Sequence, residues 1–149
     1  MTRAAAACAL AAAAIAGCGV ARYREARARD LQLRFVTSGT DGEELPRWSG
    51  EGRLRVERDV VVSARHVRVV RLEERPDGAR HLVLYLDAEG QERLAEATRG
   101  GEGRRLAIVS GGRVVVAPAV RAPIADGVAH VTVGPESDIE EVFRALAGE

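Results

Sequence analysis

Short runs of alternating apolar and polar residues recur along most of the chain, and they predict β-strands. Residues 31–36 and 128–133 place every second side chain on one face, which is the period of a half-buried strand. The valine-rich stretch 56–72 predicts two strands, or one long bent strand. Residues 81–86 are almost continuously apolar, as is typical of a central strand covered on at least one face.

Turn residues separate these strands. The sequence Arg-Pro-Asp-Gly at 75–78 predicts a turn by its residue types. A tight hairpin is predicted between strands at 105–109 and 114–117, because Gly111 and Gly112 supply the positive φ angles that such a turn needs.

Two segments have helical patterns. Asp87 offers an N-cap to a helix over 88–98, and Ser137 with Glu140 forms a predicted capping box ahead of a last helix that stops at Gly148. The order strand, helix, hairpin, strand, helix predicts an α+β domain. In this domain a mainly antiparallel sheet carries two helices packed on one face.

The N-terminus has a different character. Arg3 precedes an alanine-rich run, and the run closes with Ile15-Ala16-Gly17-Cys18. These four residues resemble the bacterial lipobox, in which the cysteine is acylated and becomes the first residue of the mature protein. The run of about 13 apolar residues is shorter than the roughly 20 of a membrane-spanning helix. We therefore predict a lipoprotein signal peptide over 1–17 and attachment to a membrane surface through a lipid on Cys18.

An ordinary secretory signal is the competing interpretation, since residues 14–16 (Ala-Ile-Ala) also fit a cleavage site. The cysteines favour the lipoprotein, because Cys8 lies in the removed leader and Cys18 would otherwise be an unpaired thiol in an oxidising compartment. Gly19, rather than aspartate, follows the cysteine. By the sorting rule of enterobacterial lipoproteins, this slightly favours the outer membrane.

Residues 18–30 are rich in arginine and have no apolar face, which leaves two interpretations open. They form either a solvated tether or a basic segment attracted to anionic lipid headgroups. Glu25 and Asp30 dilute the positive charge and favour the tether. A single domain is then expected over 31–149.

Composition narrows the classes of function. Basic and acidic residues balance at 22 each, and the chain has 1 Trp, 2 Tyr and 2 Phe, so no nucleic-acid partner is predicted. No cofactor or metal is predicted, and no nucleophile motif indicates an enzyme. The histidines are expected to face solvent from strands. Catalysis would need a pocket that gathers two or more of His66, His81, Asp87, Glu89 and His130.

Two surface features are candidates for binding a polypeptide. Trp48, in a predicted loop over 37–53, is the kind of residue that anchors interfaces, although a tryptophan folded back over the sheet is the favoured explanation. Pro118 and Pro123 are expected to stop regular strand pairing. The segment between them either exposes a sheet edge that accepts an extended chain or blocks such pairing.

Residues 80–148 carry several short motifs in a fixed order: Leu84-x-Leu86-Asp87-x-Glu89-Gly90, Gly103-Arg104-Arg105-Leu106-Ala107-Ile108-Val109, Ala117-Pro118-x-Val120 and Pro123-Ile124-x-x-Gly127. In this order and spacing they resemble the head subdomain of the first periplasmic domain of the SecD family, a component of bacterial protein export. The resemblance implies a ferredoxin-like, SecD-head-like fold, a periplasmic setting and contact with polypeptide. Val116 stands where the family usually has serine. The family's membrane helices have no counterpart in the sequence, so proton-driven translocation is not implied.

The sequence therefore predicts a lipid-anchored, non-enzymatic module that faces the periplasm and binds unfolded polypeptide or a partner in the export machinery. A structural envelope lipoprotein is the second hypothesis. A small hydrolase or ligand-binding lipoprotein on the same scaffold is the third.

Overall fold

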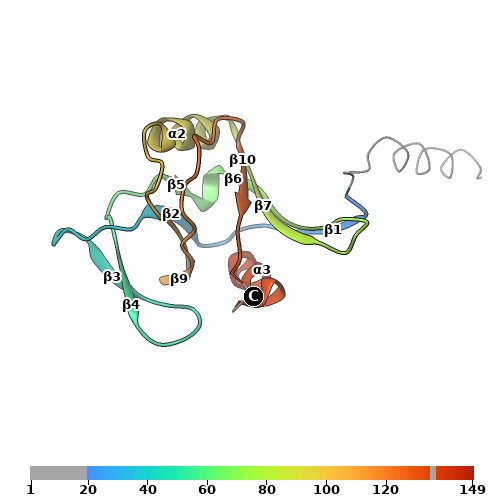
Figure 1. Ribbon diagram of the computed structural model, residues 1–149, viewed down its shortest axis with the longest axis horizontal. Helices are drawn as coiled ribbons and strands as arrows, with labels where there is room; N and C mark the ends of the chain where they lie inside the picture. The colour runs from blue at the N-terminus through green and yellow to red at the C-terminus, as the bar shows by residue number, and fades with distance from the viewer. Residues whose placement is uncertain (1–19, 135–136) are drawn as a thin grey trace, which may run out of the picture.

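The computed structural model describes residues 20–134 and 137–149, and it confirms an α+β fold of antiparallel strands with two helices (Figure 1). Within these residues the strands form two four-stranded sheets and one separate hairpin. The first sheet has the order β1-β6-β7-β10, with β1 at Arg22–Ala26, β6 at Val67–Glu74, β7 at Arg80–Leu86 and β10 at Val128–Val131. The second has the order β5-β2-β8-β9, with β5 at Val62–Ser63, β2 at Leu31–Phe35, β8 at Leu106–Ser110 and β9 at Arg113–Val116.

A hairpin of β3 (Glu43–Pro46) and β4 (Arg53–Val56) lies within the stretch predicted as loop and continues just beyond it. The loop prediction for 37–53 was therefore incomplete. Leu45 and Val56 are the buried residues of this hairpin, and they pack against one face of β8. Strand β3 (EELP) has no alternating pattern, and the alternation in β4 (RLRV) is only four residues long, so neither strand gives a clear signal in the sequence.

The two large sheets share one core. Leu31, Leu33, Leu82 and Leu84 are among its fully buried side chains, and they come from β2 of one sheet and β7 of the other. Every residue of β8 is buried, because its alternate side chains enter the main core and the smaller cluster under the β3–β4 hairpin. Burial on both faces explains why β7 and β8 have almost continuously apolar sequences.

Helix α2 spans Ala88–Thr98 as predicted, and the Asp87 side chain accepts a hydrogen bond from the Gly90 N–H at 2.7 Å. Helix α3 spans Ile139–Ala147 and ends at Gly148, whose φ of 77° is left-handed. The predicted N-cap of this helix was wrong, since Asp138 and not Ser137 accepts the N–H of Glu140. Serine and aspartate cap equally well, so residue type alone did not fix which of two neighbours would do so.

The folded part of the chain begins earlier than the expected start at residue 31. Arg22–Ala26 forms β1, which pairs with β6 from Arg22 opposite Glu74 to Ala26 opposite Val70. Four of its five residues are exposed, so β1 is held by backbone pairing with β6 and not by an apolar face. The predicted signal peptide and Cys18 lie outside the described residues. Among those described, no helix has both the length and the apolar character needed to cross a bilayer.

Candidate functional site

An apolar groove of about 650 Å³ opens between β10 and the chain segment 118–126, which we call the wall segment. Its floor is formed by core side chains from both sheets: Leu33 of β2, Leu84 of β7, and Leu106 and Ile108 of β8. The groove therefore lies where the two sheets meet, directly above buried side chains of their common core.

The wall segment is held by backbone pairing at its start. The Val120 N–H donates to the Arg104 carbonyl at 2.8 Å, and the Leu106 N–H donates to the Pro118 carbonyl at 2.9 Å. Regular strand structure stops at Val116, ahead of Pro118 as expected, but isolated pairing continues because the Pro118 carbonyl still accepts although proline has no N–H to donate.

Helix α2 holds the other end of the wall segment. The Ile124 N–H donates to the Thr98 hydroxyl at 2.9 Å, and the Gln91 side-chain amide donates to the Ala125 carbonyl at 2.8 Å. Thr98 is fully buried, and its hydroxyl also donates to the Leu94 carbonyl at 2.7 Å. One buried hydroxyl thus fixes the distance between this helix and the wall of the groove.

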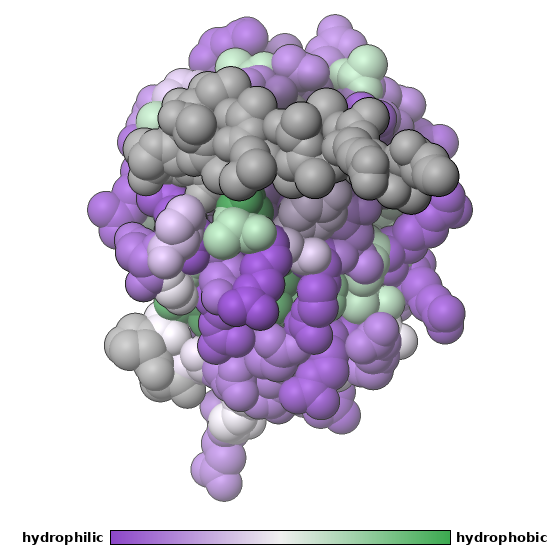
Figure 2. All heavy atoms as spheres, turned by 90° about the vertical axis from the view of Figure 1, so that its right-hand side faces the viewer, coloured by the Kyte–Doolittle hydropathy of each residue, from purple (hydrophilic) through white to green (hydrophobic). Residues whose placement is uncertain are grey.

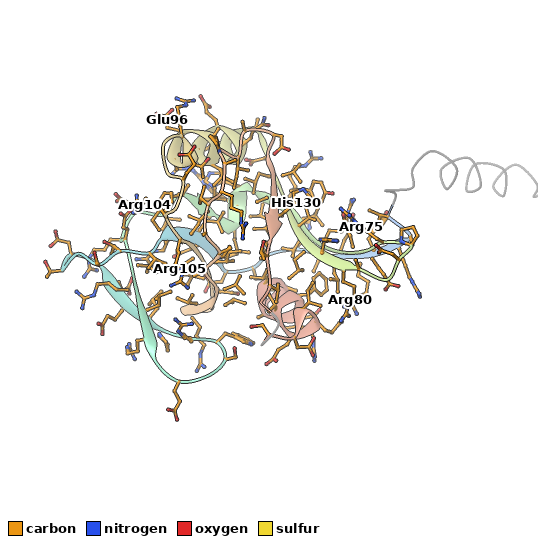
Figure 3. All side chains as sticks on the ribbon, viewed as in Figure 1. Arg75, Arg80, Glu96, Arg104, Arg105 and His130 are labelled. Atoms are coloured by element: carbon orange, nitrogen blue, oxygen red, sulfur yellow. The ribbon has the colours of Figure 1, made fainter. Side chains whose placement is uncertain are left out.

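The opposite wall is β10, whose residues alternate in exposure. Ala129 and Val131 are buried in the core, whereas His130, between them in the same strand, is exposed (Figure 3). In the part of the chain that the structure describes, β10 pairs with β7 and is the last strand of its sheet. A free strand edge beside an apolar groove is the arrangement that accepts an added extended chain.

Charges at the rim of the groove are few and mixed in sign. Arg121, Asp126 and His130 are exposed lining residues. The Asp126 carboxylate accepts the Val128 N–H at 3.1 Å and so belongs to the turn before β10. These groups do not pair a nucleophile with a base, and the groove is suited to contact with apolar groups.

Of the residues singled out in the sequence, Pro118 and Pro123 both line the groove. Trp48 does not line it. Its side chain is partly buried against the main core, and its backbone N–H donates to the Val114 carbonyl at 2.9 Å. Arg47 and Ser49 beside it line a second cavity of about 290 Å³, which shares Pro118 with the groove.

The expected solvent exposure of His66 was wrong, since the residue is only 3% exposed. It belongs to the short 3-10 helix η1 (Ala64–His66), which packs under the start of α2. The close approach needs a glycine at 90, because a Cβ there would lie 2.8 Å from the His66 Cβ. His81 is half-buried, and His130 faces solvent as expected.

His66 and Glu89 lie close together, as the hydrolase hypothesis requires, but their geometry is structural. The His66 Nδ1 accepts the Ser63 backbone N–H at 3.1 Å, so this nitrogen is not free to take a proton from the Ser63 hydroxyl at 3.3 Å. The Nε2 lies 3.2 Å from Glu89 Oε1 without the alignment of a hydrogen bond. Neither His66 nor Glu89 lines the groove.

Within the described ranges, 20–134 and 137–149, no group of three or more His, Cys, Asp or Glu side chains is placed to hold a metal ion.

The fold and the groove define an α+β module of two antiparallel sheets with an apolar groove where the sheets meet. Residues 38–139 match the family model of the SecDF P1 head subdomain, and the chain belongs to this family. This finding confirms the resemblance seen in the sequence and extends it toward the N-terminus, from residue 80 to residue 38.

Among curated proteins, the chain is similar to the protein translocase subunit SecD of Treponema pallidum (strain Nichols). The two are 34% identical over 96 residues, which cover 64% of this chain and 16% of that protein. The matched region is thus a small part of the relative's length.

Solved structures of SecDF have a similar fold. One in a super-membrane-facing form has a TM-score of 0.57 at 25% identity and covers 82% of this chain and 18% of that one. A membrane component SecDF that enhances protein export has a TM-score of 0.55 at 24% identity, covering 81% and 62%. The translocon-associated SecDF from Thermus thermophilus has a TM-score of 0.52 at 21% identity, covering 87% and 24%. The last two likenesses are evidence of the fold alone.

Proposed function

We propose that this protein is a lipid-anchored, non-enzymatic module of the bacterial cell envelope that binds extended polypeptide segments in support of protein export. The groove beside β10 is the observation that carries the proposal, because it combines an apolar floor with a strand edge. Membership of the SecDF P1 head family, together with the likeness to a curated protein translocase subunit SecD, supports the setting.

An extended segment would pair its backbone with β10 and place alternate side chains over the groove floor. Burying two leucine-sized side chains supplies about 3–6 kcal/mol before the entropy cost of association. The expected binding is therefore weak and reversible, with dissociation constants no tighter than about 40 μM and extending into the millimolar range. Such affinity suits a module that holds a chain briefly and releases it.

The membrane attachment in this proposal is a lipid on Cys18, with the domain facing the periplasm and the outer membrane as the slightly favoured location. Support comes from the sequence of the leader. Mass spectrometry of the mature N-terminus tests this part, since acylation of Cys18 adds the mass of the fatty acids. A mature chain that begins elsewhere would contradict it.

Polypeptide binding is tested with the full protein and a fluorescent peptide that is apolar and extended, followed by anisotropy. Ala122 lines the groove and is exposed, so Ala122→Asp puts a carboxylate on the wall without disturbing the core. We expect this variant to bind at least about tenfold more weakly, the loss of roughly 1.4 kcal/mol. Ala88→Asp is the matched control, because Ala88 is exposed and lies outside the groove.

Equal affinity of both variants and the unmodified protein would refute the groove as the binding site. Absence of peptide binding in the unmodified protein would favour the structural envelope role instead. The hydrolase hypothesis has no support from the groove, whose lining residues do not include His66 or Glu89.

A further inference from the structure

We infer that the domain rests on the membrane through one defined surface, the end of the β6–β7 hairpin together with the start of β1, and that this surface contacts anionic lipid headgroups. We call it the hairpin end; it comprises residues 20–24 and 74–80. The inference rests on the acylation of Cys18 proposed above, and it adds which side of the domain faces the bilayer and how closely.

The length of chain between the lipid and the sheet carries the inference. Ala21 is already fixed, since its N–H donates to the Glu74 carbonyl at 2.8 Å. Three Cα-to-Cα steps separate Cys18 from Ala21, so the two residues lie at most about 11 Å apart. A free tether over 18–30 would instead reach roughly 40 Å. Pairing of β1 with β6 therefore removes most of the distance that the domain could keep from the bilayer.

The turn of the hairpin is next to this fixed point. Glu74 is the last residue of β6 and lies opposite Arg22, and residues 75–79 connect it to β7. Residues 75–80 are all exposed, and Arg75 and Arg80 lie across the molecule from Glu96 of α2 (Figure 3). If Cys18 is held at the lipid headgroups, the hairpin end is the part of the domain that the chain brings closest to the membrane surface.

The apolar groups that the fold leaves exposed also lie here. Val20 and Tyr23 are the exposed large hydrophobic residues of the described chain, at 43% and 56%. Tyrosine is favoured at membrane interfaces, where an apolar ring and a polar hydroxyl each find a suitable neighbour. Figure 2 faces this end and shows a mainly hydrophilic surface with small apolar patches, which fits contact with headgroups and not insertion among acyl chains.

The charges at the hairpin end favour an anionic surface modestly. Residues 20–24 and 74–80 contain four arginines (Arg22, Arg24, Arg75 and Arg80) and two carboxylates (Glu74 and Asp77), and Glu140 of α3 pairs with Arg24 and Arg80. Arg22 is 79% exposed although it lies 3.3 Å from Glu74. Each arginine near an anionic leaflet adds up to about 1 kcal/mol, so the charges orient a domain that the lipid already holds.

This orientation places the groove close to the membrane. Strand β10 pairs with β7 from Leu82 to Tyr85, which is two to five residues beyond Arg80. At about 3.4 Å per residue, the groove lies roughly 7–17 Å further along the sheet than the hairpin turn. A polypeptide bound there would be held just above the headgroups.

The test places a fluorophore on the hairpin end of the full, acylated protein. Asp77→Cys labels the turn, and Glu96→Cys labels the exposed face of α2 as the matched control. Acylated Cys18 has no free thiol and Cys8 is removed with the leader, so each introduced cysteine is the single labelling site. The protein is reconstituted in vesicles of phosphatidylethanolamine and phosphatidylglycerol that contain a lipid with a nitroxide on its headgroup.

We expect several-fold stronger quenching of the label at 77 than of the label at 96. Arg75→Glu in the Asp77→Cys background should reduce the quenching on these anionic vesicles. Equal quenching at the two positions of an acylated protein would overturn the inference and leave the anchor intact. The intact mass of the same sample distinguishes failure of this inference from failure of the proposed lipid anchor. A protein without acyl groups on Cys18 would overturn the anchor itself.

Discussion

The Thr98 hydroxyl is one of two side-chain links from α2 to the wall of the groove, beside the amide of Gln91, and its removal tests whether this link holds the wall in place. In Thr98→Val the side chain keeps its shape and loses its oxygen. The Ile124 N–H then has no acceptor at this point, and the Leu94 carbonyl loses the hydroxyl that it accepts at 2.7 Å. The buried position of Thr98 keeps water from replacing the lost oxygen easily.

The cost follows from the burial of the two partners. An unsatisfied buried N–H costs about 1–3 kcal/mol, and the Ile124 N–H is only partly buried, so the lower half of this range applies. The Leu94 carbonyl adds little to this cost, because it still accepts the helical hydrogen bond from the backbone N–H four residues later. We therefore expect a loss of about 1–2 kcal/mol in the free energy of unfolding.

Urea denaturation measures this loss, and hydrogen exchange locates it. The midpoint should fall with an unchanged slope, and the amides of residues 121–126 should exchange faster while those of β7 do not. Peptide binding in the groove should weaken, because the wall is no longer held at a fixed distance from α2. Thr132→Val is the matched control, since Thr132 also lines the groove but is exposed.

Two results would refute this argument. One is a stability of Thr98→Val equal to that of Thr132→Val within about 0.5 kcal/mol, the usual spread of surface substitutions. The other is unchanged exchange at 121–126 in a destabilised variant, which would show that the hydroxyl stabilises α2 and not the wall.

Three further substitutions test other contacts. Gly90→Ala should lower the free energy of unfolding by about 1–3 kcal/mol in urea titrations, because the new Cβ would meet the His66 Cβ at 2.8 Å and its carbonyl oxygen at 3.1 Å; a gain from the higher helix propensity of alanine would contradict the packing. Burial, with a hydrogen bond to Glu73, raises the pKa of Tyr85 above its ordinary value of 10.0, so its contribution to stability is present below that pH and is lost as the pH rises through the folded-state pKa. Tyr85→Phe should therefore unfold with a flatter alkaline pH dependence than the unmodified protein, and identical profiles would exclude Tyr85 as the cause. Arg34→Met should cost about 1–3 kcal/mol by calorimetry, because the buried guanidinium binds the Glu57 carbonyl at 2.7 Å and Glu43 at 2.9 Å; a neutral result would mean that apolar packing replaces these bonds.

Local sequence determined the features that depend on a few consecutive residues. The bounds of α2, its cap at Asp87 and the stop at Gly148 follow from capping chemistry within one turn of helix. Gly111 and Gly112 have φ of 59° and 74°, as the predicted hairpin required. These elements were predictable because each is stabilised mostly by bonds among its own neighbours.

Strand β1 was not predictable in this way. Its sequence, RYREA, has no apolar alternation, and four of its five residues are exposed. It forms because β6 offers a free edge of backbone groups, and that edge exists only after the β6–β7 hairpin has formed. The same residues in isolation look like a tether.

The groove and the burial of His66 were likewise decided by tertiary structure alone. The sequence identified Pro118 and Pro123, which lie in one wall, but the floor comes from three strands of two different sheets. His66 is buried because η1 packs against Gly90, which lies 24 positions further along the chain in α2. The periodicity of a sequence shows on which face of its own strand or helix a residue lies. A cavity depends on the distances between different strands and helices, and only the packing of those elements sets these distances.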